Sequence, residues 1–238
     1  MKTLKSYFLF IYLGLFCCNF GFASIQNEPI GLFNKIWIRD GIQVVLQKGI
    51  VPKVEVSSDK DTEKSIGIQN TNGKLIIKQK DSWSNFLLRK LKPSNESLKV
   101  IVTYTNINEI FISGASSVES TDILESENLL ILVSGASRAN LQTKSNWLSL
   151  NLSGSSYCKV TGSCTKLNIK STGASRVFTK NLLSSDVSIH LTEASNAEIY
   201  AKNNLALNIT GASILKYKTE TTTKISKTIS GASTIIKL

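Results

Sequence analysis

The sequence has few of the residues with which enzymes most often carry out acid–base and metal chemistry. Its 238 residues include one histidine, His190. This residue lies between Ile189 and Leu191 in an alternating stretch, and since successive side chains of a strand point to opposite faces, we expect its ring on the surface. No second histidine exists to complete a histidine pair at a zinc-site spacing. Base catalysis by histidine and a histidine-based zinc centre are therefore not predicted.

Other sequence signatures of catalysis are also missing. The chain has neither a Gly-x-Ser-x-Gly elbow nor a glycine-rich phosphate loop ending in Lys-Ser or Lys-Thr. Enzymes that cleave polysaccharides need paired carboxylates, but the acids after residue 105 are scattered except for Glu119, Asp122, Glu125 and Glu127. We interpret these four as a solvated loop of one repeat. The sequence thus predicts a non-enzymatic protein with no catalytic residue, cofactor or metal.

Cysteine is scarce, and two of the four cysteines, Cys17 and Cys18, lie near the start of the chain. The other two, Cys158 and Cys164, could form a disulfide, because an exported protein meets oxidising conditions. They could equally be small buried side chains. Their role would be structural in either case.

Residues 1–23 are typical of a secretory signal peptide. Lys2 and Lys5 precede a long apolar stretch, and Gly21-Phe22-Ala23 supplies the small residues of a cleavage site. The alternative of a lipid anchor at Cys17 or Cys18 is less favoured, because Phe16 stands where a small residue is expected. We expect cleavage after Ala23, a linker at 24–32, and an exported protein of the periplasm, the outer membrane or the cell surface.

The chain is basic, with a formal net charge of +11. A basic surface favours anionic partners such as acidic polysaccharides or lipid headgroups, although lysine is also a common solubilising residue and a guard on strand edges. The lysines are scattered and no motif combining aromatic and basic residues recurs, so a specific nucleic-acid module is not predicted.

A short repeat organises the second half of the chain. The tetrapeptide Ser-Gly-Ala-Ser or a close variant begins at residues 113, 134, 153, 172, 192, 210 and 230, at intervals of 18 to 21 residues. A fixed period of this length indicates a solenoid, in which one coil cannot bury its own apolar face but a stack can. Two copies depart from the pattern, with Glu193 in place of glycine and Ser155 in place of alanine.

Alternating apolar residues precede each tetrapeptide, and this period of two predicts a strand with one buried face. The inward pairs are expected to be Ile110 and Ile112, Leu130 and Leu132, Leu150 and Leu152, Leu167 and Ile169, Ile189 and Leu191, and Leu207 and Ile209. A further inward position follows two residues after each tetrapeptide. Glycine can adopt positive φ at the corner and serine hydroxyls can bond to its backbone. The Glu193 corner would have either ordinary φ or an outward carboxylate.

The region from 33 to 104 is predicted to be β-structure without the repeat. Asn72-Gly73 is a strong hairpin signal, and we expect irregular or antiparallel strands that cap the first coil of the regular part, 105–238. An excursion at 81–97 interrupts this region and suggests a short amphipathic helix or loop. Its apolar and basic residues make it the candidate contact for a partner or a membrane surface, unless they pack against the sheet: Trp83, Phe86, Arg89 and Lys90.

These features together resemble a known family. The segments that carry the resemblance are Phe33 to Ile36, Gly41 to Val44, Leu98 to Thr103, Ile107 to Ser116 and the recurring Gly-Ala-Ser corners. They are similar to the putative auto-transporter adhesin, head GIN domain family, over residues 33–238 as a single domain. The resemblance implies an all-β, right-handed parallel β-helix in exported bacterial proteins, some of them lipid-anchored. The family name implies adhesion and brings no catalytic residues.

Three functions follow in order of preference. The first is an adhesin-like module that binds a glycan or another surface polymer, because a repetitive face suits a repetitive ligand. The second is a structural or assembly protein acting through self-association or a protein partner, since Ile235, Ile236 and Leu238 run to the end without a polar cap. The third is a polysaccharide-active enzyme, which would need a groove gathering two or more acids.

Overall fold

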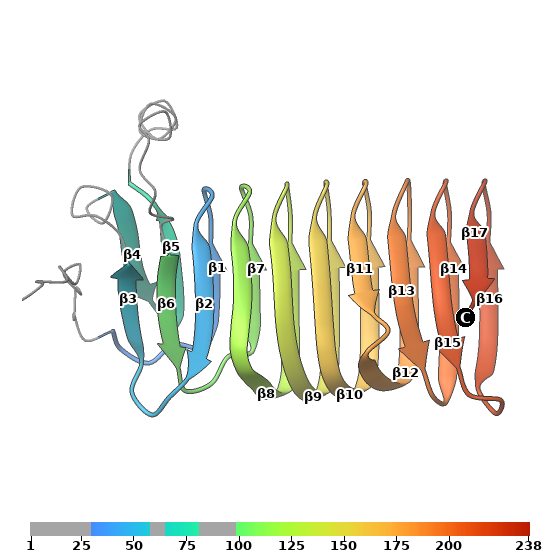
Figure 1. Cartoon of the computed structure of the whole chain (residues 1–238), viewed down its shortest axis with the longest axis horizontal. Coiled ribbons are helices and arrows are strands. Elements are labelled where there is room, and N and C mark those ends of the chain that lie inside the picture. Colours follow the sequence, from blue (N-terminus) through green and yellow to red (C-terminus); the bar gives the residue numbers. More distant parts are fainter. Residues whose placement is uncertain (1–29, 58–64, 81–98) are drawn as a thin grey trace, which may run out of the picture.

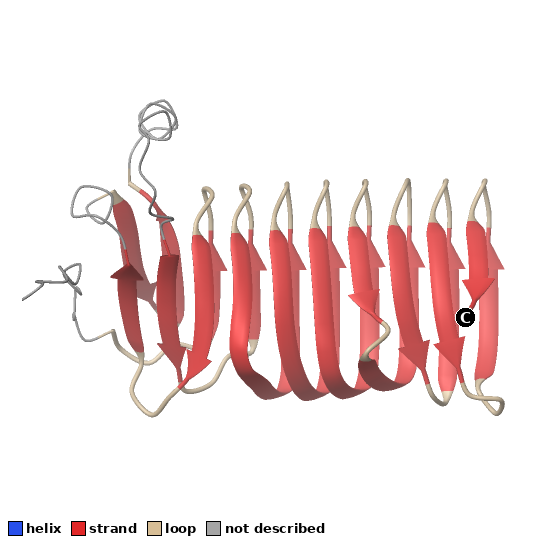
Figure 2. Cartoon of the chain, in the orientation of Figure 1, coloured by secondary structure: helices blue, strands red, loops and turns tan. Residues whose placement is uncertain are grey.

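The computed structural model describes residues 30–57, 65–80 and 99–238, and these residues form strands and turns with no helix (Figure 1, Figure 2). Most strands pair in parallel with the equivalent strand of the next coil. The all-β solenoid with a repeat of about 20 residues is therefore confirmed. The strands are β1 (Lys35–Ile38), β2 (Gln43–Lys48), β3 (Lys53–Ser57), β4 (Ile66–Thr71), β5 (Lys74–Gln79), β6 (Lys99–Tyr104), β7 (Glu109–Ile112), β8 (Ser117–Val133), β9 (Arg138–Leu152), β10 (Tyr157–Ser171), β11 (Arg176–Thr179), β12 (Leu182–Leu191), β13 (Asn196–Ala201), β14 (Asn204–Ile209), β15 (Ile214–Thr219), β16 (Lys224–Ile229) and β17 (Thr234–Lys237).

Each coil has two sides that meet at a tight corner, at the top of Figure 1. The ascending face consists of strands that run toward the corners, namely β5, β1, β7, the second halves of β8, β9 and β10, then β12, β14 and β16. The descending face consists of strands that run away from them, namely β6, β2, the first halves of β8, β9 and β10, then β11, β13, β15 and β17.

The corners stack directly on one another, as the small residues predicted. Backbone N–H groups donate from one corner to the carbonyl of the corner before it, for example Ala174 N to Gly154 O at 2.9 Å. Gly173 has φ +77, and an added Cβ there would lie 2.6 Å from the same carbonyl oxygen. Stacking at this distance, together with left-handed backbone, explains why glycine recurs at this position.

The last serine of the corner points inward, and in several corners its hydroxyl closes the turn. The Ser175 hydroxyl donates to the Thr172 carbonyl at 2.7 Å, and Ser195 and Ser213 make the same bond three residues back. These serines are buried in the described coils, so the hydroxyls satisfy carbonyl groups that the turn leaves without a ladder partner.

Glu193 occupies a glycine position and adopts the glycine conformation. Its φ is +62, so the alternative of an ordinary corner is wrong. The side chain is exposed and its carboxylate accepts a hydrogen bond of 3.1 Å from the Thr172 hydroxyl of the preceding coil. The other alternative, an outward carboxylate, is therefore confirmed.

One apolar core runs through the stack, and most inward positions lie where alternation predicted them. The predicted inward residues were wrong for the strand before Ser134. Leu130 and Leu132 face outward and are only half-buried, while Leu129, Ile131 and Val133 fill the core. Five successive apolar residues have no period of two, so the correct face could be read only from the distance to the corner.

The strands before the repeat form the predicted irregular end of the solenoid. β4 and β5 form an antiparallel hairpin with Asn72 and Gly73 at positive φ, and β3 pairs antiparallel with β6. The coil of β1 and β2 lies between the coil of β5 and β6 and that of β7 and β8. The chain therefore completes this end out of sequence order, and β3 and β4 cover it.

The four clustered acids do not form a loop, which corrects that interpretation. They lie within β8, where the register with β9 shifts between Glu119 and Ile123. Lys48 pairs with Glu125, and its backbone N–H donates to the Asp122 carboxylate at 3.0 Å. These bonds, with one from Thr121 to Asp122, hold the pKa of both carboxyls below their usual values.

Cys158 and Cys164 are free thiols buried in the core, so the disulfide alternative is wrong. They lie six residues apart on the single strand β10. An extended strand separates such residues by roughly 20 Å, far beyond the Cα separation of about 7 Å that a disulfide tolerates. Burial raises the pKa of the Cys158 thiol to about 12 and also raises that of Cys164.

The last coil differs from the others at two of its inward positions. Lys227 pairs with Leu207 and Lys237 with Tyr217, so lysine stands where earlier coils place core residues. The Lys227 ammonium lies 5.8 Å from the Tyr217 ring centroid. Inward charge on an edge strand opposes pairing with another sheet. Two lysines thus interrupt the apolar end that the sequence predicted, while Ile225, Ile229, Ile236 and Leu238 remain exposed on it.

Replacing Gly173 with alanine is expected to lower the free energy of unfolding by about 1–3 kcal/mol, because a residue with a Cβ disfavours the left-handed backbone at this position and the new Cβ crowds the Gly154 carbonyl. Urea denaturation followed by circular dichroism measures the change. Ala174→Ser, at the exposed neighbouring position, is the control and should unfold like the wild type. Equal midpoints for both variants would contradict the account of the corner.

Replacing Lys227 with leucine is expected to promote end-to-end association, because it restores an apolar column beside unpaired strands. Light scattering coupled to size exclusion, over a range of concentrations, detects the change in mass. Lys218→Leu removes the same charge from an exposed position next to the buried Tyr217. If the two variants have the same mass as the wild type, Lys227 does not protect this end.

Candidate functional site

Several hollows of the described surface lie on the ascending face. One of about 700 Å³ crosses β10, β12, β14 and β16. A second of about 400 Å³ crosses β7, β8 and β9, and Trp147 on β9 lines both. A third of about 470 Å³ lies nearer the corners and is lined by His190 among others. We take the first as the candidate site because it is larger than the second and the exposed ring of Trp147 stands at its end.

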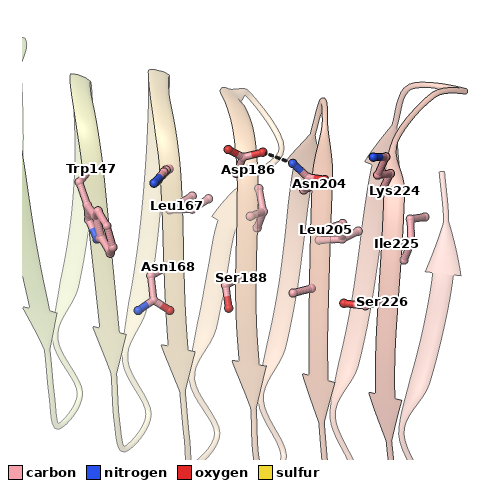
Figure 3. Close-up of a pocket in the computed structure, with 13 residues that line it drawn as sticks. Trp147, Leu167, Asn168, Asp186, Ser188, Asn204, Leu205, Lys224, Ile225 and Ser226 are labelled. Atoms are coloured by element: carbon pink, nitrogen blue, oxygen red, sulfur yellow. Dashed lines mark hydrogen bonds between the residues drawn. The ribbon is translucent and has the colours of Figure 1, made fainter.

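The side chains around this hollow form a row across the strands. Each stands six residues before its corner tetrapeptide, and parallel pairing places each beside the next. Figure 3 shows the row from Trp147 at one end to Lys224 at the other. Its members, in spatial order, are Trp147, Lys166, Asp186, Asn204 and Lys224.

Short side chains beside this row make the hollow. They occupy the position four residues before each corner, and they include Ser188, Ala206 and Ser226. These three are exposed. Because none extends far from the sheet, the hollow lies over these small side chains and the backbone, beside the longer side chains of the row.

Trp147 is a large aromatic side chain of this region, and its ring is exposed to solvent. It is 44% exposed, and the Lys166 ammonium lies 5.6 Å from its ring centroid. A ring in this position offers an apolar face and an indole N–H donor to a ligand. It can therefore stack against a flat ligand that enters the hollow from the side.

Asp186 and Asn204 form the polar centre of the row. The Asn204 side-chain amide donates to the Asp186 carboxylate at 2.6 Å (Figure 3). This bond fixes both groups side by side, and it leaves a carboxylate oxygen, an amide oxygen and an amide hydrogen for other partners. Such a pair can accept from and donate to neighbouring hydroxyls.

A second aromatic cluster on the ascending face is already satisfied by its own neighbours. Trp37 and Phe111 pack at 5.2 Å, Arg39 lies over both rings, and Lys74 lies 4.0 Å from the Trp37 centroid. The Trp37 indole also donates to Glu109 at 3.0 Å. These contacts cover the rings, so Trp147 is the better exposed of the two tryptophans.

The hollow has no arrangement suited to catalysis or metal binding among its described residues. Asp186 is the single acid in its lining, whereas hydrolysis of a glycosidic bond requires a carboxylate pair. No group of three or more His, Cys, Asp or Glu side chains that could hold a metal occurs in the described ranges. What the lining can do is bind, through one ring and several polar groups.

The sequence did not single out these residues. Trp83, Phe86, Arg89 and Lys90, which it proposed as the contact site, lie outside the described residues. His190 lies outward on β12, as alternation predicted, and is half-buried. Aligning the repeats on their tetrapeptides and reading the sixth residue before each would have brought the row together.

No helix of the described residues has the length and apolar character needed to cross a membrane.

Solved structures share this fold at low sequence identity. A putative adhesin from Bacteroides fragilis superposes with a TM-score of 0.78 at 18% identity, covering 90% of this chain and 96% of its own. A protein from Parabacteroides distasonis described as a putative lipid binding protein superposes with a TM-score of 0.67 at 18% identity, covering 92% of this chain and 97% of its own. A putative adhesin from the same species has a TM-score of 0.71 at 17% identity, covering 90% of this chain and 96% of its own. These likenesses establish the fold alone.

Comparison of sequences places the chain in a family. No curated protein resembles it closely enough to count as a relative. The family described as "Putative auto-transporter adhesin, head GIN domain", however, matches residues 32–221. Because that match spans most of the chain, the protein belongs to the auto-transporter adhesin head GIN domain family.

Proposed function

We propose that this protein is an exported, non-catalytic binding module of the bacterial cell envelope, which holds a surface polysaccharide against the ascending face of its solenoid. The observation that carries the proposal is the row that begins at the exposed Trp147 and continues across the hollow. Export is inferred from the signal-like residues 1–23. Membership of the adhesin family agrees with a role at a surface.

The chemistry of the row matches that of a sugar. A pyranose ring has a face of C–H groups and an edge of hydroxyls, so its binding site needs an aromatic surface beside hydrogen-bonding groups. Trp147 supplies the first, and the Asp186–Asn204 pair supplies both acceptors and donors. A concave site with a few convergent polar groups is the usual form of a ligand site.

The shape of the site favours a polymer over a single sugar. The hollow crosses four strands of successive coils, each about 4.8 Å from the next. A linear chain lying along the solenoid axis would meet equivalent positions of one coil after another. Repetition in the protein is then matched by repetition in the ligand.

The other candidate functions receive less support. Self-association through the last coil is opposed by Lys227 and Lys237 at inward positions. Cleavage of a polysaccharide lacks a second carboxylate beside Asp186 in this hollow, and in the hollow lined by Glu125 and Glu127 the Glu125 carboxylate is already paired with Lys48. A protein partner or peripheral membrane contact through residues 81–97 stays a prediction of the sequence.

Replacing Trp147 with alanine is expected to weaken saccharide binding about tenfold, because the stacking surface is lost. Binding of the protein from Ser24 to Leu238 to an array of bacterial and host glycans, at low and physiological salt, identifies ligands, and calorimetry on the best of them measures the change. Tyr157→Ala removes an aromatic ring from the opposite, descending face of β10 and should bind like the wild type.

Two results would count against the proposal. Equal affinity of the wild type and Trp147→Ala would remove the hollow as the binding site. Absence of any saturable saccharide binding at physiological salt would remove polysaccharide binding as the function. Circular dichroism of each variant separates loss of binding from loss of fold.

A further inference from the structure

The two ends of the hollow carry positive charge. Lys166 on β10 and Lys224 on β16 stand in the same row with two coils between them. Three coil steps separate their backbones by about 14 Å along the axis. Both side chains are exposed, so each can turn toward a ligand that lies over the strands.

These two lysines are not neutralised within the described chain. Neither forms an ion pair there, whereas Lys35, Lys48, Lys53, Lys180 and Lys216 each pair with a glutamate. The acid between them, Asp186, already accepts a hydrogen bond from the Asn204 side-chain amide. The lining therefore has two unpaired cations and one carboxylate with a partner, which is complementary to an anionic ligand.

The separation of the lysines decides what kind of anion fits. The backbones of the two lysines are about 14 Å apart, so with both side chains extended outward the ammonium groups face two separate anionic groups rather than one phosphate or one carboxylate. A ligand that satisfies both must be extended and must carry negative charges at intervals. The Asp186–Asn204 pair further requires hydroxyls between those charges. Trp147, which lies beyond Lys166 at the end of the row, requires a flat apolar face there.

We propose that the ligand is an acidic polysaccharide, a linear chain with carboxylate-bearing sugars, which lies along the solenoid axis over the hollow. This inference rests on the proposed function and specifies its ligand. One sugar stacks on Trp147, hydroxyls bond to Asp186 and Asn204, and carboxylates contact Lys166 and Lys224. Charge-assisted bonds of this kind are stronger than neutral ones.

A single-stranded nucleic acid is also extended and anionic, but it fits the site less well. Proteins that bind such strands combine a dense positive groove with a series of aromatic platforms. The lining of the hollow has one exposed ring, two lysines and a carboxylate. Polyuridylate is therefore included in the test as a competing outcome.

The experiment compares polymers that differ only in charge. Polygalacturonate, alginate and hyaluronate are each measured beside their carboxyl-reduced forms, by calorimetry at 50 and 150 mM salt. We expect the preferred acid polymer to bind about tenfold tighter than its reduced form. The double variant K166Q/K224Q should lose this preference and bind the acid and reduced forms alike, and added salt should weaken binding of the acid polymer more than that of the reduced form in the wild type.

A matched control and the Trp147 variant separate the possible failures. Lys159→Gln changes an exposed lysine on the descending side of the same strand, and should retain the preference. Equal binding of acid and reduced forms, with both weakened by Trp147→Ala, would overturn the acidic ligand but leave polysaccharide binding standing. Binding of no polymer would overturn both.

Two further outcomes would also overturn the assignment. Loss of the preference in Lys159→Gln, or its retention in K166Q/K224Q, would place the charge contact elsewhere on the protein. Binding of polyuridylate tighter than that of every polysaccharide would replace the ligand class with nucleic acid.

Discussion

The structure depends on the backbone bonds that join one corner to the next. Ala174 N to Gly154 O and Ala194 N to Gly173 O belong to a ladder that holds neighbouring turns at strand distance. At that distance a Cβ added to Gly173 would lie 2.6 Å from the previous carbonyl oxygen, and the backbone is left-handed, so the position favours glycine. Glu193 carries a side chain at the equivalent position with φ +62. Each corner is therefore aligned with the one before it, and this alignment sets the strand register on both faces.

A fixed register turns separate outward residues into one surface. Trp147, Lys166, Asp186, Asn204 and Lys224 are far apart along the sequence, but each stands at the same distance before a corner. The fold places few demands on these positions, because the core is filled by the residues between them. The outward row can therefore carry binding chemistry without cost to the packing that supports it.

Much of the fold could be predicted from the sequence because its signals are local. The corner tetrapeptide and the alternation in copies such as Leu150 and Leu152 were sufficient for the repeated coils. Leu129 to Val133 had no alternation to read, and the position of β1 and β2 between later strands depends on pairing over long distances. Lys227 stands three residues before its tetrapeptide, where earlier copies place core residues such as Leu207, so its inward position also follows from the distance to the corner. The candidate site was missed because its members meet only when the coils are stacked.

The shallow, open form of the site constrains how it can bind. Exposed ion pairs contribute little individually, since water and salt screen them, and one exposed ring adds a modest stacking contribution. A small ligand touching one or two of these groups would be held weakly. A polysaccharide chain can touch Trp147, the Asp186–Asn204 pair and both lysines at once. After its first contact forms, each further contact is intramolecular, so the affinities of the individual contacts combine. The same stacking that fixes the fold thus makes an extended polymer the ligand best able to use the whole row.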